Sequence, residues 1–272
     1  MITIGIDPIA FTIGAISIRW YGIFVVLNIL VIVLWMLREV RRGANLSYDT
    51  ILTAALVGIP SGIIFSRLLH VVDRWDIFSH NPGQIIGFEG LTFYGAVLGA
   101  ALAIWIYSKF SNFKFGYLAD LIAPAIALGH AIGGRVGCTI NGCCHGIEAP
   151  SWLLGAIGYS PIHPPPDGYQ VSAHLLGVPL YPTQPYEIIW DLIVFALLLR
   201  LRGRFKPDRS LFLVYLSLYS LWRVGIDFLR EGTPFLFGLH QAQVIALIVL
   251  AITIPLLAYR TRWVEQVTDG NG

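Results

Sequence analysis

Long apolar stretches alternate with short connections rich in arginine and lysine, and this pattern constrains the fold more than any other feature. Only 12% of the 272 residues are charged and 56% are hydrophobic, whereas soluble domains carry roughly 25% charged residues. A helix that crosses a bilayer needs about 20 mostly apolar residues. We therefore expect an all-α integral membrane protein, with residues 1–272 forming a single transmembrane domain. The candidate spans cover residues 18–37, 50–71, 91–108, 118–136, 187–201, 210–228 and 239–259.

The basic residues predict the orientation of these seven spans. Twelve of the 18 Lys and Arg residues fall on one side of the membrane if the N-terminus is outside and the C-terminus is cytoplasmic. Such asymmetry is what the positive-inside rule describes. The twelve residues are Arg38, Arg41, Arg42, Lys109, Lys114, Arg200, Arg202, Arg204, Lys206, Arg209, Arg260 and Arg262.

The longest connection, residues 138–185 between helices four and five, is rich in proline and has little helical periodicity. Long connections of this kind are often functional loops or lids. With the predicted orientation, this segment is an extracytoplasmic loop or lid. Its prolines include Pro161, Pro164, Pro165, Pro166, Pro179, Pro182 and Pro185.

Several arginines lie near the expected outer ends of the spans. An arginine at the centre of a span costs ~2.5–3.5 kcal/mol on insertion scales and therefore needs a partner, a wet cavity or a function. Arg135 and Arg223 come from different helices at similar depth, where two guanidinium groups suit a phosphate. The structural alternative is that Arg223 pairs with Asp227 at i,i+4, while Arg67 and Arg230 reach the headgroups. The pattern favours binding of an anionic lipid.

Four tyrosines at expected span ends are typical of an aromatic belt at the membrane interface. Tyr94 differs from the others because Gly95 and Gly99 follow it and permit close approach of another backbone. The four tyrosines are Tyr21, Tyr94, Tyr186 and Tyr219.

Residues 133–146 are unusually rich in glycine and contain every cysteine of the chain. The glycines predict a backbone that leaves helix four and exposes N–H groups beside Arg135, which again favours an anion. Cys138, Cys143 and Cys144 permit a metal site, although a second ligand pair is missing. A disulfide outside the cell, a nucleophile activated by His145, and simple packing are the other interpretations.

Motifs along most of the chain resemble the prolipoprotein diacylglyceryl transferase family. Gly134-Arg135-x-Gly137, Asn141-Gly142 and Gly146 follow the frame of the family signature, and Gln243 falls where the seventh helix carries a glutamine. The other matching segments are Arg19-Trp20-Tyr21-Gly22, Ser66-Arg67, Asn81-Pro82, Gly90-Leu91-Thr92-Phe93-Tyr94-Gly95, Pro182-Thr183-Gln184-Pro185-Tyr186-Glu187 and Tyr219-x3-Arg223-x3-Asp227-x2-Arg230-Glu231.

The resemblance implies an enzyme of the bacterial cytoplasmic (inner) membrane whose active site faces the outer leaflet. It would move a diacylglyceryl group from phosphatidylglycerol to the lipobox cysteine of a prolipoprotein signal peptide, forming a thioether and releasing glycerol phosphate. No metal, organic cofactor or nucleic acid is implied. Arg135, Arg223 and Tyr94 would be catalytic. The implied substrate-binding residues are Tyr21, Arg67, Asn141, Gly146, Gln184, Tyr186, Glu187, Tyr219, Asp227 and Arg230.

The chain departs from the family pattern at three positions. Tyr94, Cys138 and Cys143 stand where the family typically has His, Asn and Glu. A tyrosine, whose pKa is ordinarily about 10, is a poor general base at neutral pH, but it can donate a hydrogen bond to a phosphate. Two other functions stay open at this point: a noncatalytic lipid-binding or transport protein, and a cysteine-based redox or metal membrane protein.

Overall fold

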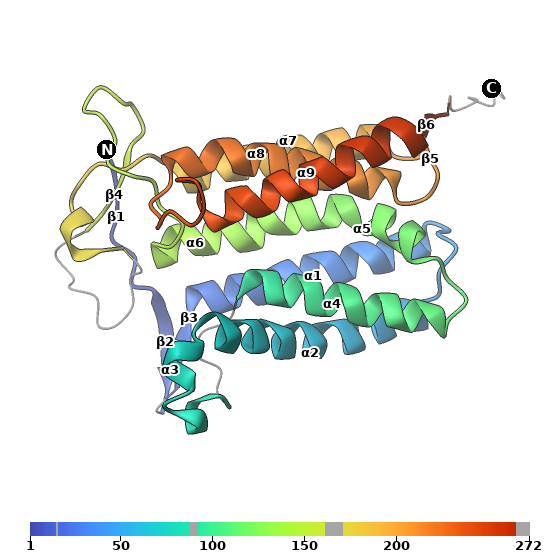
Figure 1. Ribbon diagram of the computed structural model, residues 1–272, viewed down its shortest axis with the longest axis horizontal. Coiled ribbons are helices and arrows are strands. Elements are labelled where there is room, and N and C mark those ends of the chain that lie inside the picture. The colour runs from blue at the N-terminus through green and yellow to red at the C-terminus, as the bar shows by residue number, and fades with distance from the viewer. Residues whose placement is uncertain (15, 87–91, 161–170, 265–272) are drawn as a thin grey trace. The chain divides into compact units, whose positions relative to one another are not determined.

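The computed structural model describes residues 1–14, 16–86, 92–160 and 171–264 of a mostly helical chain (Figure 1). The α-helices are α1 (Trp20–Arg41), α2 (Tyr48–Asp73), α3 (Trp75–Phe78), α4 (Phe93–Lys109), α5 (Phe115–Gly129), α6 (Val136–Asn141), α7 (Thr183–Leu201), α8 (Ser210–Ile226) and α9 (Gln241–Arg260). A π-helical turn, η2 (His130–Arg135), joins α5 to α6, and 3-10 turns are η1 (Pro82–Gln84), η3 (Ala173–Leu175) and η4 (Asp227–Leu229). The strands are β1 (Ile2–Ile4), β2 (Ile9–Ile13), β3 (Ile16–Arg19), β4 (Ile157–Tyr159), β5 (Phe205–Lys206) and β6 (Arg262–Trp263).

Five helical segments of the described chain are long and apolar enough to cross a membrane: α1, α2, the continuous run Phe115–Asn141, the run Ser210–Leu229, and α9. The prediction of a helical protein with several spans is confirmed at this level. Helix α4 is a shorter apolar helix of 17 residues, and α7 is long enough but carries Glu187, Asp191 and Arg200. The count of seven spans and their orientation stay predictions.

Large apolar side chains on the outside of the helices agree with a lipid environment. Leu56 on α2 is 73% exposed and Ile64 is 64% exposed. Contiguous exposed apolar surface is rare on soluble monomers. Transfer of such faces into hydrocarbon removes them from water, so these helices are suited to a bilayer.

The chain divides into two compact units, one formed by Met1–Ile32 with the chain from Ala119 onward, and one formed by Val33–Leu118. In the second unit, α2 and α4 pack closely because Gly95 has no side chain: a Cβ there would lie 2.5 Å from the Phe65 carbonyl oxygen. Ser66 Oγ donates to the Thr92 carbonyl at 2.8 Å, and Thr92 Oγ1 donates to the Ser66 carbonyl at 2.9 Å. These paired bonds fix the start of α4 against α2.

In the first unit, the run through α5, η2 and α6 packs on the beginning of α1. A Cβ at Gly133 would lie 2.6 Å from the Phe24 carbonyl oxygen, and one at Gly137 would lie 2.9 Å from Phe24 Cβ. The glycines therefore permit contact between two helices. The core between α5, α7 and α8 contains Ala123, Ala127, Val194, Leu198, Leu211 and Tyr215.

The prediction that helix four breaks at its glycines is wrong. The backbone stays helical through η2 and α6 and leaves the helix only at Gly142, whose φ is 74°. Glycines that lack side chains let the two helices approach, which stabilises the helix against α1 rather than opening it. The fifth helix also begins four residues earlier than expected, at Thr183.

The described part of the 138–185 connection contains β4, which pairs in parallel with β1 near the N-terminus. A small core of Ile157, Tyr159, Val171, Leu175 and Leu180 holds it together. Pro161 and Pro164–Pro166 lie outside the described residues. Figure 1 places β1, β4 and α6 at one end of the first unit and β5 and β6 at the other.

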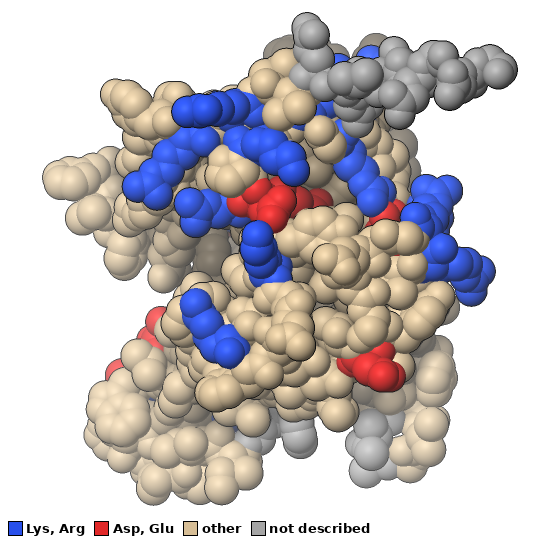
Figure 2. All heavy atoms as spheres, turned by 90° about the vertical axis from the view of Figure 1, so that its right-hand side faces the viewer, with Lys and Arg blue, Asp and Glu red and all other residues tan. Residues whose placement is uncertain are grey.

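Basic residues gather at the end of the first unit that carries β5 and β6. Antiparallel pairing of Lys206 with Arg262 brings the α7–α8 connection beside the end of α9, and Arg204 lies 5.6 Å from the ring centroid of Trp263. Figure 2 shows Lys and Arg side chains clustered over this end of the helices. The structure thus brings together two of the basic groups that the sequence assigns to the cytoplasmic side.

Candidate active site

Glu187, in the second turn of α7, is the centre of a buried charge network. Its Oε1 lies 2.9 Å from Arg135 Nη2, 3.3 Å from Arg223 Nη1 and 3.6 Å from Arg230 Nη1. The side chain is almost fully buried, with a relative exposure of 2%. One carboxylate therefore holds three guanidinium groups, one from η2, one from the last turn of α8 and one from the residue after η4.

Asp227 completes this arginine network, which we define as Arg135, Arg223, Arg230, Glu187 and Asp227. Asp227 Oδ1 lies 3.2 Å from Arg223 Nη2 and 3.6 Å from Arg230 Nε. The i,i+4 pair expected between Arg223 and Asp227 is present. Arg230 does not extend away from the protein, because it pairs with both carboxylates.

Local backbone structure aims each arginine at the network. Arg135 closes the π-helical turn η2, where one extra residue per turn rotates the side chains that follow. Asp227 begins η4, and the tight turn places Arg230 three residues further on beside the same carboxylate. A change from α-helical winding therefore occurs at Arg135, in η2, and just before Arg230, in η4.

The arginine network has one more positive than negative charge, since three guanidinium groups face two carboxylates. Arg135 Nε and Arg223 Nε are buried and, among the described residues, have no hydrogen-bond partner. Buried donors without partners are costly. An anion with several acceptor oxygens would satisfy both charge and donors, so this network is a candidate phosphate site.

Gln184, which the family motif predicts to be a substrate-binding residue, and its neighbour Thr183 hold the turn that follows α6. Gln184 Nε2 donates to the Cys143 carbonyl at 3.0 Å and to Tyr159 Oη at 3.1 Å. Thr183 Oγ1 donates to the Cys144 carbonyl at 2.8 Å. The start of α7 therefore fixes the turn after α6 beside Glu187.

Tyr159 links the same turn to the connection between α6 and α7. Its hydroxyl donates to the Thr139 carbonyl at 3.1 Å while accepting from Gln184. Burial raises the pKa of Tyr159 above its ordinary value. The phenol therefore stays protonated at neutral pH and keeps its donor role.

Gly146 allows the chain after the cysteines to lie against the segment that carries Arg230. Gly146 and Arg230 form an antiparallel bridge, and Glu231 N donates to the His145 carbonyl at 3.2 Å. A Cβ at Gly146 would lie 2.5 Å from the Tyr181 carbonyl oxygen. In the structure, Gly146 positions Arg230 through the backbone.

Two cavities of the first unit open beside the network. A polar cavity of about 290 Å³ has Asp227, Arg230, Glu231 and His240 in its wall. An apolar one of about 380 Å³ lies between α7 and α8 and is lined by Tyr186, Trp190, Leu221, Trp222, Gly225, Ile226 and Leu229. The predicted residue Tyr186 lines this second cavity, which we call the α7–α8 groove.

Three other predicted residues lie in the first unit near the network. Asn141 is buried at the end of α6, and its Oδ1 has no hydrogen-bond partner among the described residues. Tyr219 packs on His130 with ring centroids 5.6 Å apart. Tyr21 lies over α6, since a Cβ at Gly137 would be 3.5 Å from its ring.

Arg67 and Tyr94 belong to the second unit, and each contacts residues of that unit. Arg67 Nε donates to the Ile85 carbonyl at 3.0 Å, its Nη2 donates to the Gln84 carbonyl, and its guanidinium lies 5.0 Å from the Phe78 ring centroid. Arg67 thus anchors the turn after α3. Tyr94 lies in the first turn of α4 and packs edge-on against Phe93 at 6.0 Å.

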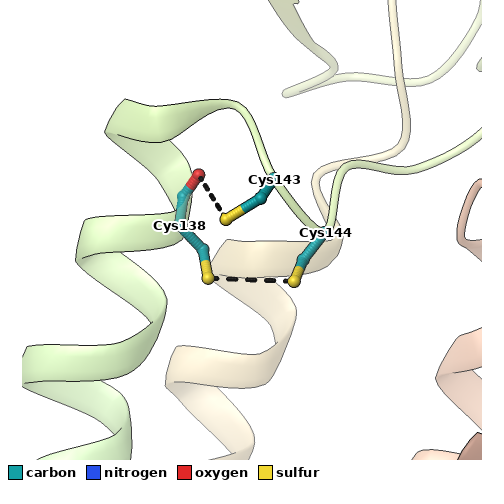
Figure 3. A group of neighbouring side chains, drawn as sticks. All are labelled: Cys138, Cys143 and Cys144. Carbon is teal, nitrogen blue, oxygen red and sulfur yellow. Dashed lines mark hydrogen bonds between the residues drawn. The ribbon is translucent and has the colours of Figure 1, made fainter. Parts of the chain in front are cut away.

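The cysteines are free thiols in the structure and lie around one point. Cys138 Sγ donates to Cys144 Sγ at 3.8 Å, and Cys143 Sγ donates to the Cys138 carbonyl at 3.9 Å (Figure 3). His145 does not join them, because its Nδ1 bonds to the Gly146 carbonyl at 3.1 Å. Hydrogen bonds from Cys138 and Cys143, together with the charges of Arg135 and Arg223, hold the pKa of Cys144 well below its ordinary value.

His130 and Asp191 form a buried pair that was not predicted from the sequence. His130 Nδ1 lies 3.3 Å from Asp191 Oδ2, both largely buried. Asp191 is four residues after Glu187 in an otherwise apolar stretch of α7, and that spacing places both carboxylates on one face of the helix. A carboxylate at Asp191, within an apolar helix, is the sequence signal that could have identified the pair.

Apolar helices long enough to cross a bilayer, together with a buried arginine network holding surplus positive charge, define a multi-pass membrane protein with a candidate anion site. Residues 8–259 match the family described as Prolipoprotein diacylglyceryl transferase. The chain belongs to this family, as its motifs indicated.

Curated relatives agree over nearly the full length. The chain is 49% identical over 262 residues to a phosphatidylglycerol–prolipoprotein diacylglyceryl transferase of Dehalococcoides mccartyi, covering 96% of each chain. A protein of the same name from Clostridioides difficile is 36% identical over 89% of this chain and 90% of its own. One from Symbiobacterium thermophilum is 32% identical over 98% and 97%.

Proposed function

We propose that this protein transfers the diacylglyceryl group of phosphatidylglycerol to the lipobox cysteine thiol of a prolipoprotein. The relatives carry this substrate pair in their names. The observation in this chain that supports the proposal is the convergence of Arg135, Arg223 and Arg230 on Glu187. Their arrangement suits the phosphate of a lipid headgroup.

The arginine network matches the charge that develops in this reaction. The substrate sulfur forms a bond to the glyceryl carbon, the bond from that carbon to the phosphate oxygen breaks, and the thiol loses its proton. Glycerol phosphate leaves with one more negative charge than the phosphodiester carried. Surplus positive charge in a buried site stabilises this leaving group more than it stabilises the substrate, which is how a binding site lowers a barrier.

The α7–α8 groove suits part of an acyl chain. Tyr186 and Leu229 lie at the network end of the groove. Trp190 lies about one helical turn further along α7, and Leu221 about two turns further along α8. An apolar groove that starts beside a phosphate site matches the two ends of a phospholipid. Tyr186 then contacts substrate through its ring, and the network contacts the headgroup.

The proposed topology has seven spans, with the N-terminus outside, the C-terminus in the cytoplasm of a bacterium and the active site toward the outer leaflet. Basic residues at the β5–β6 end of the first unit support this orientation, because the arginine network and α6 lie toward its other end. The 138–185 connection is then an extracytoplasmic loop.

The test is transfer by purified protein in detergent with phosphatidylglycerol and a lipobox peptide, with the thioether product read by mass. Arg135→Ala and Arg223→Ala should each lower the rate by roughly 10²–10³-fold, the usual loss of one buried donor to developing charge. Arg74→Ala, which removes an exposed charge from the end of α2, is the matched control and should keep full rate.

Absence of product from the wild type would refute the proposed reaction. If the wild type retained labelled phosphatidylglycerol without forming a thioether, the protein would be a lipid-binding relative. Unchanged rates in both arginine variants would show that the network has another role.

A further inference from the structure

Cys138, Cys143 and Cys144 form a cluster that the proposed reaction does not use, because the nucleophile belongs to the substrate protein. Their three Sγ atoms all lie within 4.8 Å of one another. Figure 3 shows Cys138 on α6 and the other two on the turn that follows, with Cys144 Sγ facing Cys138 Sγ and Cys143 Sγ directed at the Cys138 carbonyl. We propose that these three thiols form a site for one soft, thiophilic cation, zinc(II) or copper(I).

The sulfur separations favour a metal over a disulfide. Zinc–sulfur bonds of ~2.3 Å around a single ion place sulfur atoms ~3.8–4.0 Å apart. Cys138 Sγ and Cys144 Sγ are 3.8 Å apart, whereas a disulfide needs ~2.05 Å. The third sulfur, Cys143 Sγ, lies within 4.8 Å of the other two.

The turn that carries Cys143 and Cys144 is held in an unusual conformation. Gly142 has a φ of 74° and Cys144 has a φ of 63°, a left-handed value that non-glycine residues rarely adopt. Hydrogen bonds from Thr183 and Gln184 hold both cysteine carbonyls in place. Such strained residues persist where the surroundings fix them, and they cluster at ligand sites.

Charge balance also supports the site. Zinc(II) held by three thiolates forms a complex with one negative charge, and each cysteine that is protonated beforehand releases its proton to solvent. No electron is transferred. Arg135 and Arg223 both interact electrostatically with Cys144, so thiolates at this site lie in a favourable positive field. Thiolate ligands select zinc and copper(I) over harder cations such as magnesium.

The consequence is a bound ion that joins the end of α6 to the turn that α7 holds. Thr139, four residues after Arg135, donates to the Arg135 carbonyl at 2.9 Å within the same helical run. The ion would therefore stabilise the segment next to the arginine network. The transfer reaction itself has no step that requires it, so metal binding and transfer can be measured separately.

The experiment uses the full chain, purified in detergent, reduced and freed of metal by a chelator. Zinc is titrated against a chromophoric competitor, and copper(I) is titrated anaerobically in a second series. We expect one equivalent of ion per chain and at least tenfold weaker binding in each of Cys138→Ser, Cys143→Ser and Cys144→Ser. His145→Ala, which removes a ring bonded to Gly146, is the matched control and should bind as the wild type does.

Cadmium provides a second readout, because its thiolate charge-transfer absorption scales with the number of sulfur ligands. The wild type should show three thiolates and Cys143→Ser two. Cys143 is only half-buried, so this variant is suited to preserve the fold, and size-exclusion profiles check that it does.

Wild-type protein that binds zinc and copper(I) no better than the triple serine variant would overturn the proposal. A disulfide among these cysteines that resists the reductant and stays intact in the presence of zinc would also overturn it. Because these titrations contain no lipid or peptide, their failure leaves the proposed transfer untouched. Failure of transfer likewise leaves the metal titration intact.

Discussion

Glu187 Oε1 and Arg135 Nη2 lie 2.9 Å apart where α7 packs against the π-helical turn η2, and both side chains are almost completely buried. Arg223 and Arg230 share the same carboxylate oxygen. Glu187 is therefore the counter-ion that keeps three arginines close together, and this relationship sets the first prediction.

Glu187→Ala should destabilise the protein and abolish transfer, because three buried guanidinium groups lose their common partner. Breaking a buried ion pair by removing one member costs about 3–5 kcal/mol. Thermal unfolding in detergent and the transfer rate measure the two effects. Glu148→Gln, which changes an exposed carboxylate in the same part of the chain, should alter neither. A stable, active Glu187→Ala protein would contradict the assigned role.

Gln184→Leu should loosen the turn that carries Cys143, because the Gln184 amide donates to both the Cys143 carbonyl and Tyr159 Oη. Leaving buried partners unsatisfied costs about 1–3 kcal/mol. We expect a lower unfolding temperature and a fall in kcat, since Glu187 follows Gln184 in the same helix. The comparison is Tyr159→Phe, which removes both hydroxyl contacts, with Thr139 and Gln184, but keeps the bond from Gln184 to the Cys143 carbonyl. It should have a smaller effect. Equal effects of the two variants would place the important contact at Tyr159.

Gly146→Ala should displace the backbone that positions Arg230. The added Cβ would lie 2.5 Å from the Tyr181 carbonyl oxygen and 2.9 Å from the Leu229 carbonyl oxygen, closer than atoms can pack. Overpacking of this kind costs about 1–3 kcal/mol. Transfer rate and unfolding temperature should both fall. Gly83→Ala is the control, because a Cβ at Gly83 meets nothing within 4 Å, and it should behave as the wild type does.

Gly225→Leu tests the α7–α8 groove. A leucine would project into the groove lined by Trp190 and Trp222, where an acyl chain is proposed to lie. We expect the KM for phosphatidylglycerol to rise about tenfold, a change of about 1.4 kcal/mol, with an unfolding temperature close to that of the wild type. A lipid analogue with short acyl chains should show a smaller difference. An unchanged KM for the long-chain lipid would exclude the groove as its binding site.

Much of the site was accessible from the sequence. Arg135, Arg223 and Asp227 stood out because charges in apolar helices need partners, and the structure brings them together. The sequence indicated a phosphate fork of two arginines. Arg230 and Glu187 were also implied by the resemblance, but only the structure joins Arg230 to this pair and places Glu187 between the three arginines. Side-chain partners depend on how α7 packs against η2 and α8.

The behaviour of the glycines could not be predicted from their spacing. Gly133 and Gly137 suggested a broken helix, whereas they permit α1 to approach an unbroken one. Glycine frees the backbone and also removes a side chain from an interface, and local sequence does not say which effect prevails. The packing partner, Phe24, is over one hundred residues away in the chain.

Composition and apolar periodicity determined by themselves that this chain is a helical membrane protein, and the placement of arginine and lysine predicted its orientation. These properties follow from the cost of placing charge and unsatisfied backbone in hydrocarbon, which acts on each segment separately. Only the tertiary structure decided that Glu187 holds three arginines and that the three cysteines converge. Those relationships join residues distant in sequence, and packing of α6, α7 and α8 sets them.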